Sequence, residues 1–164
     1  MLKRVAAATQ VRKRKAMRRY FEDFEIGETW KSETVTLSEA DIIDYAKVYD
    51  PQPIHTDPEA AAEGPFKTVI ASGWQIAALS MRLFVESGGY GDTPVVGMGI
   101  EALKWRRPVR PGDTLRVTRE VIATERSETK PDRGVIKTQV SMINQKDEVV
   151  MTLVSLGQVP TREG

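Results

Sequence analysis

The sequence predicts an α+β domain in which a curved antiparallel sheet wraps around a long buried central helix. Two observations predict this fold class. Helical periodicity dominates before residue 90, whereas alternating strand patterns follow one another after residue 94. In addition, the segment 73–86 is apolar around nearly its whole circumference, as expected of a buried helix. The 164 residues suit one domain, which we place at 20–160, after a basic extension over 1–19.

The extension differs sharply in charge from the rest of the chain. It holds eight Lys or Arg residues and no acid, which leaves 16 basic against 23 acidic residues elsewhere, a formal charge of −7. A targeting segment, an arm for nucleic acid or membrane, and a solvated leader before a start at Met17 all fit this composition. We favour the leader, because an acidic body offers nucleic acid no basic stripe. We therefore expect no nucleic-acid or membrane partner and a cytoplasmic location.

Several functional classes are excluded or disfavoured by composition. Without cysteine there is no disulfide, no thiol nucleophile and no cysteine-bound metal. With a single histidine, a zinc site would need several carboxylates, so we expect neither a metal nor a cofactor. No window approaches 18 uninterrupted apolar residues, which excludes a hydrophobic membrane-spanning helix.

The first elements are an early strand and a helix. Apolar residues within 30–37 suit a strand. The pattern then becomes helical over 39–49, with Ser38 as N-cap and Asp41 three residues later, close to a capping box. One face of this helix carries Ile42, Tyr45, Ala46 and Tyr49.

The single histidine lies in the stretch DPQPIHTDP, residues 50–58. Pro51 ends the preceding helix and Pro53 fixes its own φ, so Asp50 and His55 flank a stiff segment. A rigid loop between two polar side chains suits a site that needs preorganised groups. It suits a simple turn as well, in which Asp50 caps the turn and His55 binds a backbone carbonyl. Asp57 is interpreted as the N-cap of a short helix in PEAAAEG rather than as a catalytic acid.

The central helix and the sheet complete the chain. The helix is predicted to start at Gly73 and to end at the Gly88-Gly89 pair, and Ser72 either caps it or contacts a substrate. Four strand patterns follow, in PVVGMGIEALKW, TLRVTREVIATE, GVIKTQVSMINQ and DEVVMTLVSLGQV.

Three blocks resemble the MaoC-type (R)-specific enoyl-CoA hydratases of the hot-dog fold. The first is Asp50-Pro51-Gln52-Pro53-Ile54-His55-Thr56-Asp57, the second is Phe66 with Ile70-Ala71-Ser72-Gly73, and the third is RRPVRPGDTL at 106–115. The resemblance covers about residues 20–158. Two positions depart from the family signature: Gln52 replaces an asparagine and Ser72 replaces a histidine.

The resemblance implies a hot-dog fold and a hydro-lyase acting on an acyl-CoA or acyl-carrier-protein thioester. Asp50 and His55 would activate the water, and the N–H of Gly73 would polarise the thioester, with glycine also allowing close approach of the acyl group. Substrate contacts are expected from Gln52, Ile54, Phe66 and Ser72. Arg106, Arg107 and Arg110 are expected to form a solvated rim or, alternatively, to bind a coenzyme A phosphate.

Other functions remain open at this point. Hot-dog domains also host thioesterases, and the Gln52 and Ser72 departures suit a non-catalytic acyl-thioester-binding module. A lone hot-dog domain would expose a sheet edge and part of its helix, so we expect a homodimer or a dimer of dimers, with the site near the subunit boundary.

Overall fold

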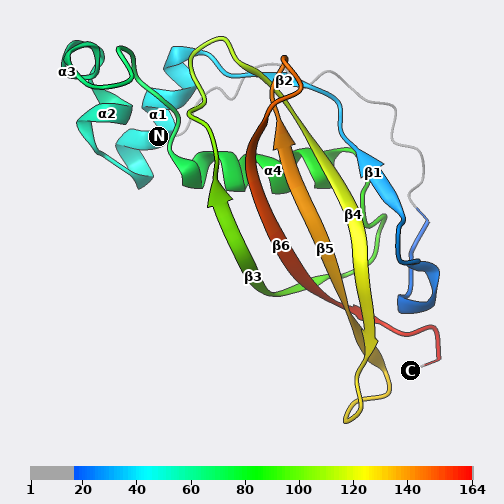
Figure 1. Cartoon of the computed structure of the whole chain (residues 1–164). Helices are drawn as coiled ribbons and strands as arrows, with labels where there is room; N and C mark the ends of the chain where they lie inside the picture. The colour runs from blue at the N-terminus through cyan, green and yellow to red at the C-terminus, as the bar shows by residue number, and fades with distance from the viewer. Residues whose placement is uncertain (1–16, 164) are drawn as a thin grey trace.

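The computed structural model describes residues 17–163, in which one antiparallel sheet is crossed on one face by a long helix. This helix is α4 (Gly73–Glu86), and the three shorter helices lie together beyond one end of the sheet (Figure 1). The predicted α+β class with a sheet around a central helix is confirmed. The interpretation of residues 1–16 as a solvated leader lies outside the described residues.

The sheet has the strand order β1-β4-β5-β6-β3, and β2 also pairs with β4. Four long strands follow the helices, as the alternating patterns predicted: β3 (Val96–Trp105), β4 (Thr114–Arg126), β5 (Arg133–Ile143) and β6 (Val149–Pro160). The early strand expected within 30–37 is divided into two short pieces, β1 (Thr29–Lys31) and β2 (Val35–Thr36). Both pair with β4, so this segment closes one edge of the sheet.

Edge strand β3 has two register shifts relative to its partner β6, one between Gly97 and Gly99 and one between Glu101 and Lys104. Glu101 is opposite Val154 and Lys104 is opposite Thr152, so three steps on β3 match two on β6. This is the geometry of a β-bulge, and Ala102 within it has a positive φ of 51°. After the bulge, Trp105 is opposite Met151, whose side chain is fully buried in the core.

The short helices are delimited by the residues expected from the sequence. Helix α1 spans Glu39–Tyr49, with Ser38 and Asp41 forming a complete capping box, so the predicted range and cap are confirmed. Helix α3 (Pro58–Glu63) is capped by Asp57, whose carboxylate accepts from the N–H groups of Glu59 and Ala60. Between them the stiff segment forms one more helical turn, α2 (Pro53–Thr56), which the sequence analysis did not predict.

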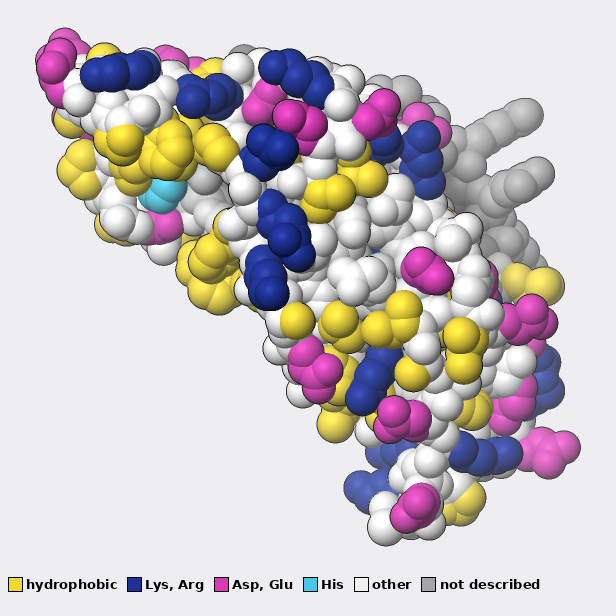
Figure 2. Space-filling model, viewed as in Figure 1, with side chains coloured by type: hydrophobic (Ala, Val, Ile, Leu, Met, Phe, Trp, Pro, Cys, Tyr) yellow, Lys and Arg dark blue, Asp and Glu magenta, His cyan; other side chains and the backbone are white. Residues whose placement is uncertain are grey.

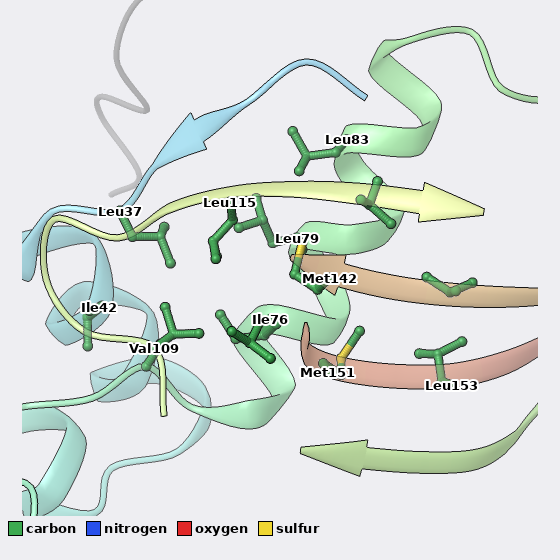
Figure 3. Close-up of a cluster of buried hydrophobic side chains, with 14 of the residues drawn as sticks. Leu37, Ile42, Ile76, Leu79, Leu83, Val109, Leu115, Met142, Met151 and Leu153 are labelled. Carbon is green, nitrogen blue, oxygen red and sulfur yellow. The ribbon is translucent and has the colours of Figure 1, made fainter. Parts of the chain in front are cut away.

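Helix α4 buries one face against the sheet and leaves the opposite face exposed. Ile76, Leu79 and Leu83 pack with Leu115, Met142 and Met151 of the strands (Figure 3). Each fully buried side chain of this size contributes about 1.5–3 kcal/mol to stability.

Part of α4 is exposed in the single chain, as expected for a lone hot-dog domain. Trp74 and Val85 are 56% and 62% exposed, and Met81 is exposed as well. The reason is that one sheet covers only one side of a helix.

Residues 17–28 pack beside the loop that follows α4. The Arg19 N–H donates to Thr93 Oγ1 at 2.6 Å, and its guanidinium binds both carboxylate oxygens of Glu28 at 2.8 and 2.6 Å. Arg19, grouped by composition with the basic extension, is thus held against the folded domain. None of the helices within residues 17–163 combines the length and hydropathy needed to cross a bilayer.

Candidate active site

The end of α1 and the start of α2 position two candidate catalytic side chains. Asp50 is the C-cap of α1 and donates its backbone N–H to Ala46 at 2.9 Å. Pro51 prevents the helix from continuing, and Pro53 occupies the first turn of α2, where the missing N–H has no cost. His55 follows in this turn with its side chain buried. The two prolines therefore bend the chain so that Asp50 and His55, five positions apart, can lie close together.

The structure brings Asp50 and His55 together. Nε2 of His55 lies 3.4 Å from Oδ2 of Asp50. The other ring nitrogen, Nδ1, is 2.7 Å from the carbonyl oxygen of Ile70. A carbonyl only accepts, so Nδ1 carries the hydrogen, and in the neutral ring Nε2 presents a lone pair on the side of Asp50. Two acceptors then face each other, an arrangement that a donor of two hydrogens, such as water, can bridge.

A second segment of the chain is fixed to this pair. The N–H of Ile70 donates to the carbonyl of Ile54 at 3.2 Å, while the Ile70 carbonyl accepts from His55. These two bonds hold residues 70–73 beside α2, although 15 positions separate Ile70 from His55. The imidazole orientation is thereby set by backbone geometry.

Asp50 is oriented by the two residues at which the chain departs from the family signature. Gln52 Nε2 donates to Oδ1 at 2.7 Å, and Ser72 Oγ donates to Oδ2 at 2.6 Å. The hydrogen bonds from Gln52 and Ser72 hold the pKa of the Asp50 carboxyl below its usual value; together they outweigh the effect of burial, which raises it, and His55 makes a smaller contribution in the lowering direction. Asp50 is therefore an ionised acceptor at neutral pH.

Ser72 has two roles in the structure. Its side chain is 0% exposed, and its Oγ also accepts from the N–H of Trp74 at 3.3 Å, which caps α4. The capping alternative and a contact within the site are thus both present. The sequence analysis placed Gln52 and Ser72 against a substrate, whereas in the structure both bind Asp50.

Gly73 begins α4, so its N–H has no partner within the helix. The space beside its Cα is taken by an indole: a Cβ added to Gly73 would lie 2.2 Å from Cε2 of Trp105. The expectation that this glycine admits the acyl group is therefore wrong on that side, where Trp105 already approaches the backbone. No sequence signal marked Trp105, because its contact depends on the β3 bulge.

A cleft of about 300 Å³ opens beside His55 and the start of α4. In Figure 2 the chain's single histidine reaches the surface beside hydrophobic side chains, and Lys and Arg side chains lie across from it. Of the predicted site residues, His55, Phe66 and Gly73 line the cleft, whereas Gln52, Ile54 and Ser72 do not. The other lining residues are Ile70, Ala71, Ile76, Trp105, Arg106, Arg107, Pro108, Val109 and Val150. The Asp50 carboxylate lies behind this lining, 3.4 Å from Nε2 of His55, which lines the cleft.

The three arginines after β3 differ in their surroundings. Arg106 and Arg107 line the cleft, and Arg107 is 3.6 Å from Glu148 in an exposed ion pair. Arg110 donates to the carbonyl of Phe66 at 2.6 Å and so ties the loop before α4 to the sheet. Two of the three are therefore at the cleft, and the third supports its wall. Among residues 17–163, no group of three or more His, Asp or Glu side chains is placed to hold a metal ion.

Comparisons with known proteins agree with this architecture. The family described as MaoC like domain matches residues 23–144. The protein YdeM of Bacillus subtilis, itself uncharacterized, is 34% identical over 126 residues, which cover 77% of this chain and 88% of that protein.

Two solved structures extend the comparison. The MaoC-like dehydratase of Rhodospirillum rubrum is 38% identical, with a TM-score of 0.81 over 89% of this chain and 99% of that one. R-hydratase PhaJ1 from Pseudomonas aeruginosa is 28% identical, with a TM-score of 0.64 over 87% and 86% of the two chains. The fold is the hot-dog fold of these proteins, and the chain belongs to the family of MaoC-like domains.

Proposed function

We propose that this MaoC-like protein is a hydro-lyase that adds water to a trans-2-enoyl thioester to give an (R)-3-hydroxyacyl thioester, and catalyses the reverse reaction. The observation that carries the proposal is the Asp50–His55 pair, with 3.4 Å between Oδ2 and Nε2 at the wall of a cleft. The dehydratase and R-hydratase named among the similar structures are in accord with it.

In this proposal the two acceptors hold one water. Asp50, kept ionised by Gln52 and Ser72, accepts one hydrogen, and the Nε2 lone pair of His55 accepts the other. The water oxygen bonds to C3 as the C2–C3 π bond breaks, and C2 takes a proton from the pair, so that one water is added overall. Because the water is hydrogen-bonded to both Asp50 and His55, it can approach C3 from only one face of the substrate. That face fixes the configuration at C3.

Charge that develops on the thioester oxygen needs a donor in the cleft. The N–H of Gly73 is suited to this role, because it is at the positive end of α4 and lines the cleft. Trp105 against Gly73 limits the approach to that N–H from one side. We propose that Gly73 polarises the thioester through its backbone alone.

We further propose that coenzyme A is the carrier. Arg106 and Arg107 line the cleft in a protein whose residues beyond the extension carry a formal charge of −7. Guanidinium groups bind phosphates in bidentate fashion, and coenzyme A carries several phosphates close together. The acyl chain would then lie toward the apolar side of the cleft, along Phe66 and Ile76.

A homodimer is proposed as the working assembly. Strand β3 ends the strand order of the sheet in the described chain and exposes Val96, Met98 and Ile100, while α4 exposes Trp74, Met81 and Val85. An exposed edge strand beside an apolar helix face is costly for a lone chain. Light scattering after size-exclusion chromatography should give twice the chain mass, and a mass of one chain at micromolar concentration would contradict the dimer.

The decisive experiment follows crotonyl-CoA by the loss of its conjugated-thioester absorbance, beside a free-thiol assay. The wild type should consume the enoyl group without releasing thiol. Asp50→Asn and His55→Gln should each lower kcat/KM by at least about 10²-fold while thioester binding persists. Asp57→Asn is the matched control, because its side chain caps α3 away from the pair.

Two outcomes would overturn the proposal. Thiol release without enoyl loss would identify a thioesterase. Binding of crotonyl-CoA by the wild type with no turnover would identify a binding module.

A further inference from the structure

A second, smaller cavity lies at the opposite end of α4 from the cleft. It has a volume of about 30 Å³ and is lined by residues of the 17–28 segment, the end of α4, and strands β4 and β5. Its lining residues are Arg19, Phe24, Glu28, Trp30, Phe84, Gly89, Tyr90, Arg119, Val121 and Thr138. The proposed hydratase reaction does not use any of them.

The distinctive group in this cavity is the buried guanidinium of Arg119. This residue of β4 is 4% exposed and stacks 3.8 Å above the ring centre of Phe84. One of its terminal nitrogens, Nη1, donates to the hydroxyl oxygen of Tyr90 at 3.1 Å. Its Nε is fully buried and has no hydrogen-bond partner within residues 17–163. A buried donor without an acceptor destabilises the fold, and more so when it is charged.

The charge of Arg119 is also uncompensated among the described residues. Glu28 is the one carboxylate that lines the cavity, and both of its oxygens are bound by Arg19. Residues 1–16, which the structure does not describe, contain no Asp or Glu. The cavity lining therefore carries two guanidinium groups against one carboxylate, a net charge of +1.

Burial disfavours the charged form and lowers the pKa of Arg119, although its contact with Tyr90 acts in the opposite direction. Arginine nevertheless remains protonated in proteins near neutral pH. The cation therefore persists inside the fold, where an anion of matching size is favoured.

We propose that this cavity binds a monovalent, halide-sized anion, which is chloride under ordinary conditions. The donor is the Nε–H of Arg119, which has no other partner within residues 17–163, while Nη1 of the same guanidinium is occupied by Tyr90. A volume of about 30 Å³ exceeds the roughly 10–15 Å³ that one water requires, so the cavity has room for a monatomic ion. The bound ion neutralises Arg119 and stabilises the packing of residues 17–28 beside the loop that follows α4.

The first test measures the Tm of the full chain in sodium chloride and in sodium gluconate at equal ionic strength. Chloride should raise the Tm of the wild type by about 3 °C or more, with saturation as its concentration increases. Arg119→Met should abolish this difference.

Arg116→Met is the matched control. Arg116 lies on the same strand and also has a buried Nε without a partner, but its charge is paired with Asp147. This variant should keep the full chloride dependence. Equal Tm values for the wild type in the two salts would overturn the proposal, as would a chloride effect that Arg119→Met retains.

Crystals soaked in bromide provide a second, independent measurement. An anomalous peak within hydrogen-bond distance of Arg119 Nε is the expected result. Water alone at that position in bromide-soaked crystals would refute the anion site even if Arg119→Met failed to fold.

Discussion

Removal of the Ser72 hydroxyl eliminates both of its hydrogen bonds. Ser72→Ala deletes a hydrogen bond to the ionised Asp50 and the cap of α4. A bond to a charged group contributes about 1.5–3 kcal/mol and an N-cap contributes about 1 kcal/mol. The free energy of unfolding should therefore fall by roughly 2.5–4 kcal/mol. With about 2–4 °C per kcal/mol for a chain of this size, the Tm should drop by about 9 °C.

Ser38→Ala is the comparison that isolates the link to Asp50. Ser38 also caps α1 and also donates to a carboxylate, that of Asp41 at 2.6 Å, but this bond is exposed to solvent and does not contact the site. Because water competes for an exposed bond, the loss of this hydroxyl should cost only about 1 kcal/mol, or about 3 °C in Tm. The difference between the two variants measures the additional stability that the partly buried Ser72–Asp50 bond supplies.

The pH dependence supplies a second readout for Ser72→Ala. Because the pKa of Asp50 is lowered in the folded state, its contribution to stability is present above its unfolded pKa of about 3.9 and is lost as the pH falls through the folded value. Without Ser72 the folded pKa moves up toward the usual value, so this contribution shrinks and the acid limb of kcat/KM moves to higher pH. Equal Tm losses in the two serine variants, with an unmoved acid limb, would refute the reasoning.

Three further predictions concern other parts of the chain. Gly73→Ala should cost about 1–3 kcal/mol by overpacking, and thermal unfolding of a double-mutant cycle should show a smaller cost in a Trp105→Ala background. Arg107→Ala should raise the KM for crotonyl-CoA about 5- to 10-fold, as expected for about 1 kcal/mol of binding. It should leave the KM for the crotonyl thioester of pantetheine unchanged. The control Arg82→Ala, in the last turns of α4, should change neither KM. Deletion of residues 1–16 should preserve circular dichroism and activity, and a large loss of either would contradict a leader without a structural role.

Local signals in the sequence predicted the parts of the fold that depend on neighbouring residues. The capping box at Ser38, the proline after Asp50 and the glycine that starts α4 each act within a few positions, so helix boundaries followed from them. The proximity of Asp50 and His55 was anticipated through a family resemblance. Spacing alone allowed a separation of about 17 Å.

What the sequence could not predict depends on contacts between distant segments. The bond from Ser72 to Asp50 joins positions 22 apart, and nothing near either residue identifies the other. The stacking of Arg119 on Phe84 requires the register between a strand and a helix end. The sequence pattern did not identify which residues of α4 lie on its exposed face, because an apolar side chain gives the same pattern whether sheet, partner or solvent covers it.

The bulge between Glu101 and Lys104 in β3 has a consequence for how the cleft is built. Side chains alternate along a strand, so the extra position exchanges the two faces for everything that follows it. If the pairing ran on regularly from Glu101 through every residue, Lys104 would take the place opposite Met151, and an ammonium group would project into the hydrophobic layer while the indole turned to solvent. One backbone irregularity near Ala102 thus decides whether the start of α4 meets an aromatic ring or a charge.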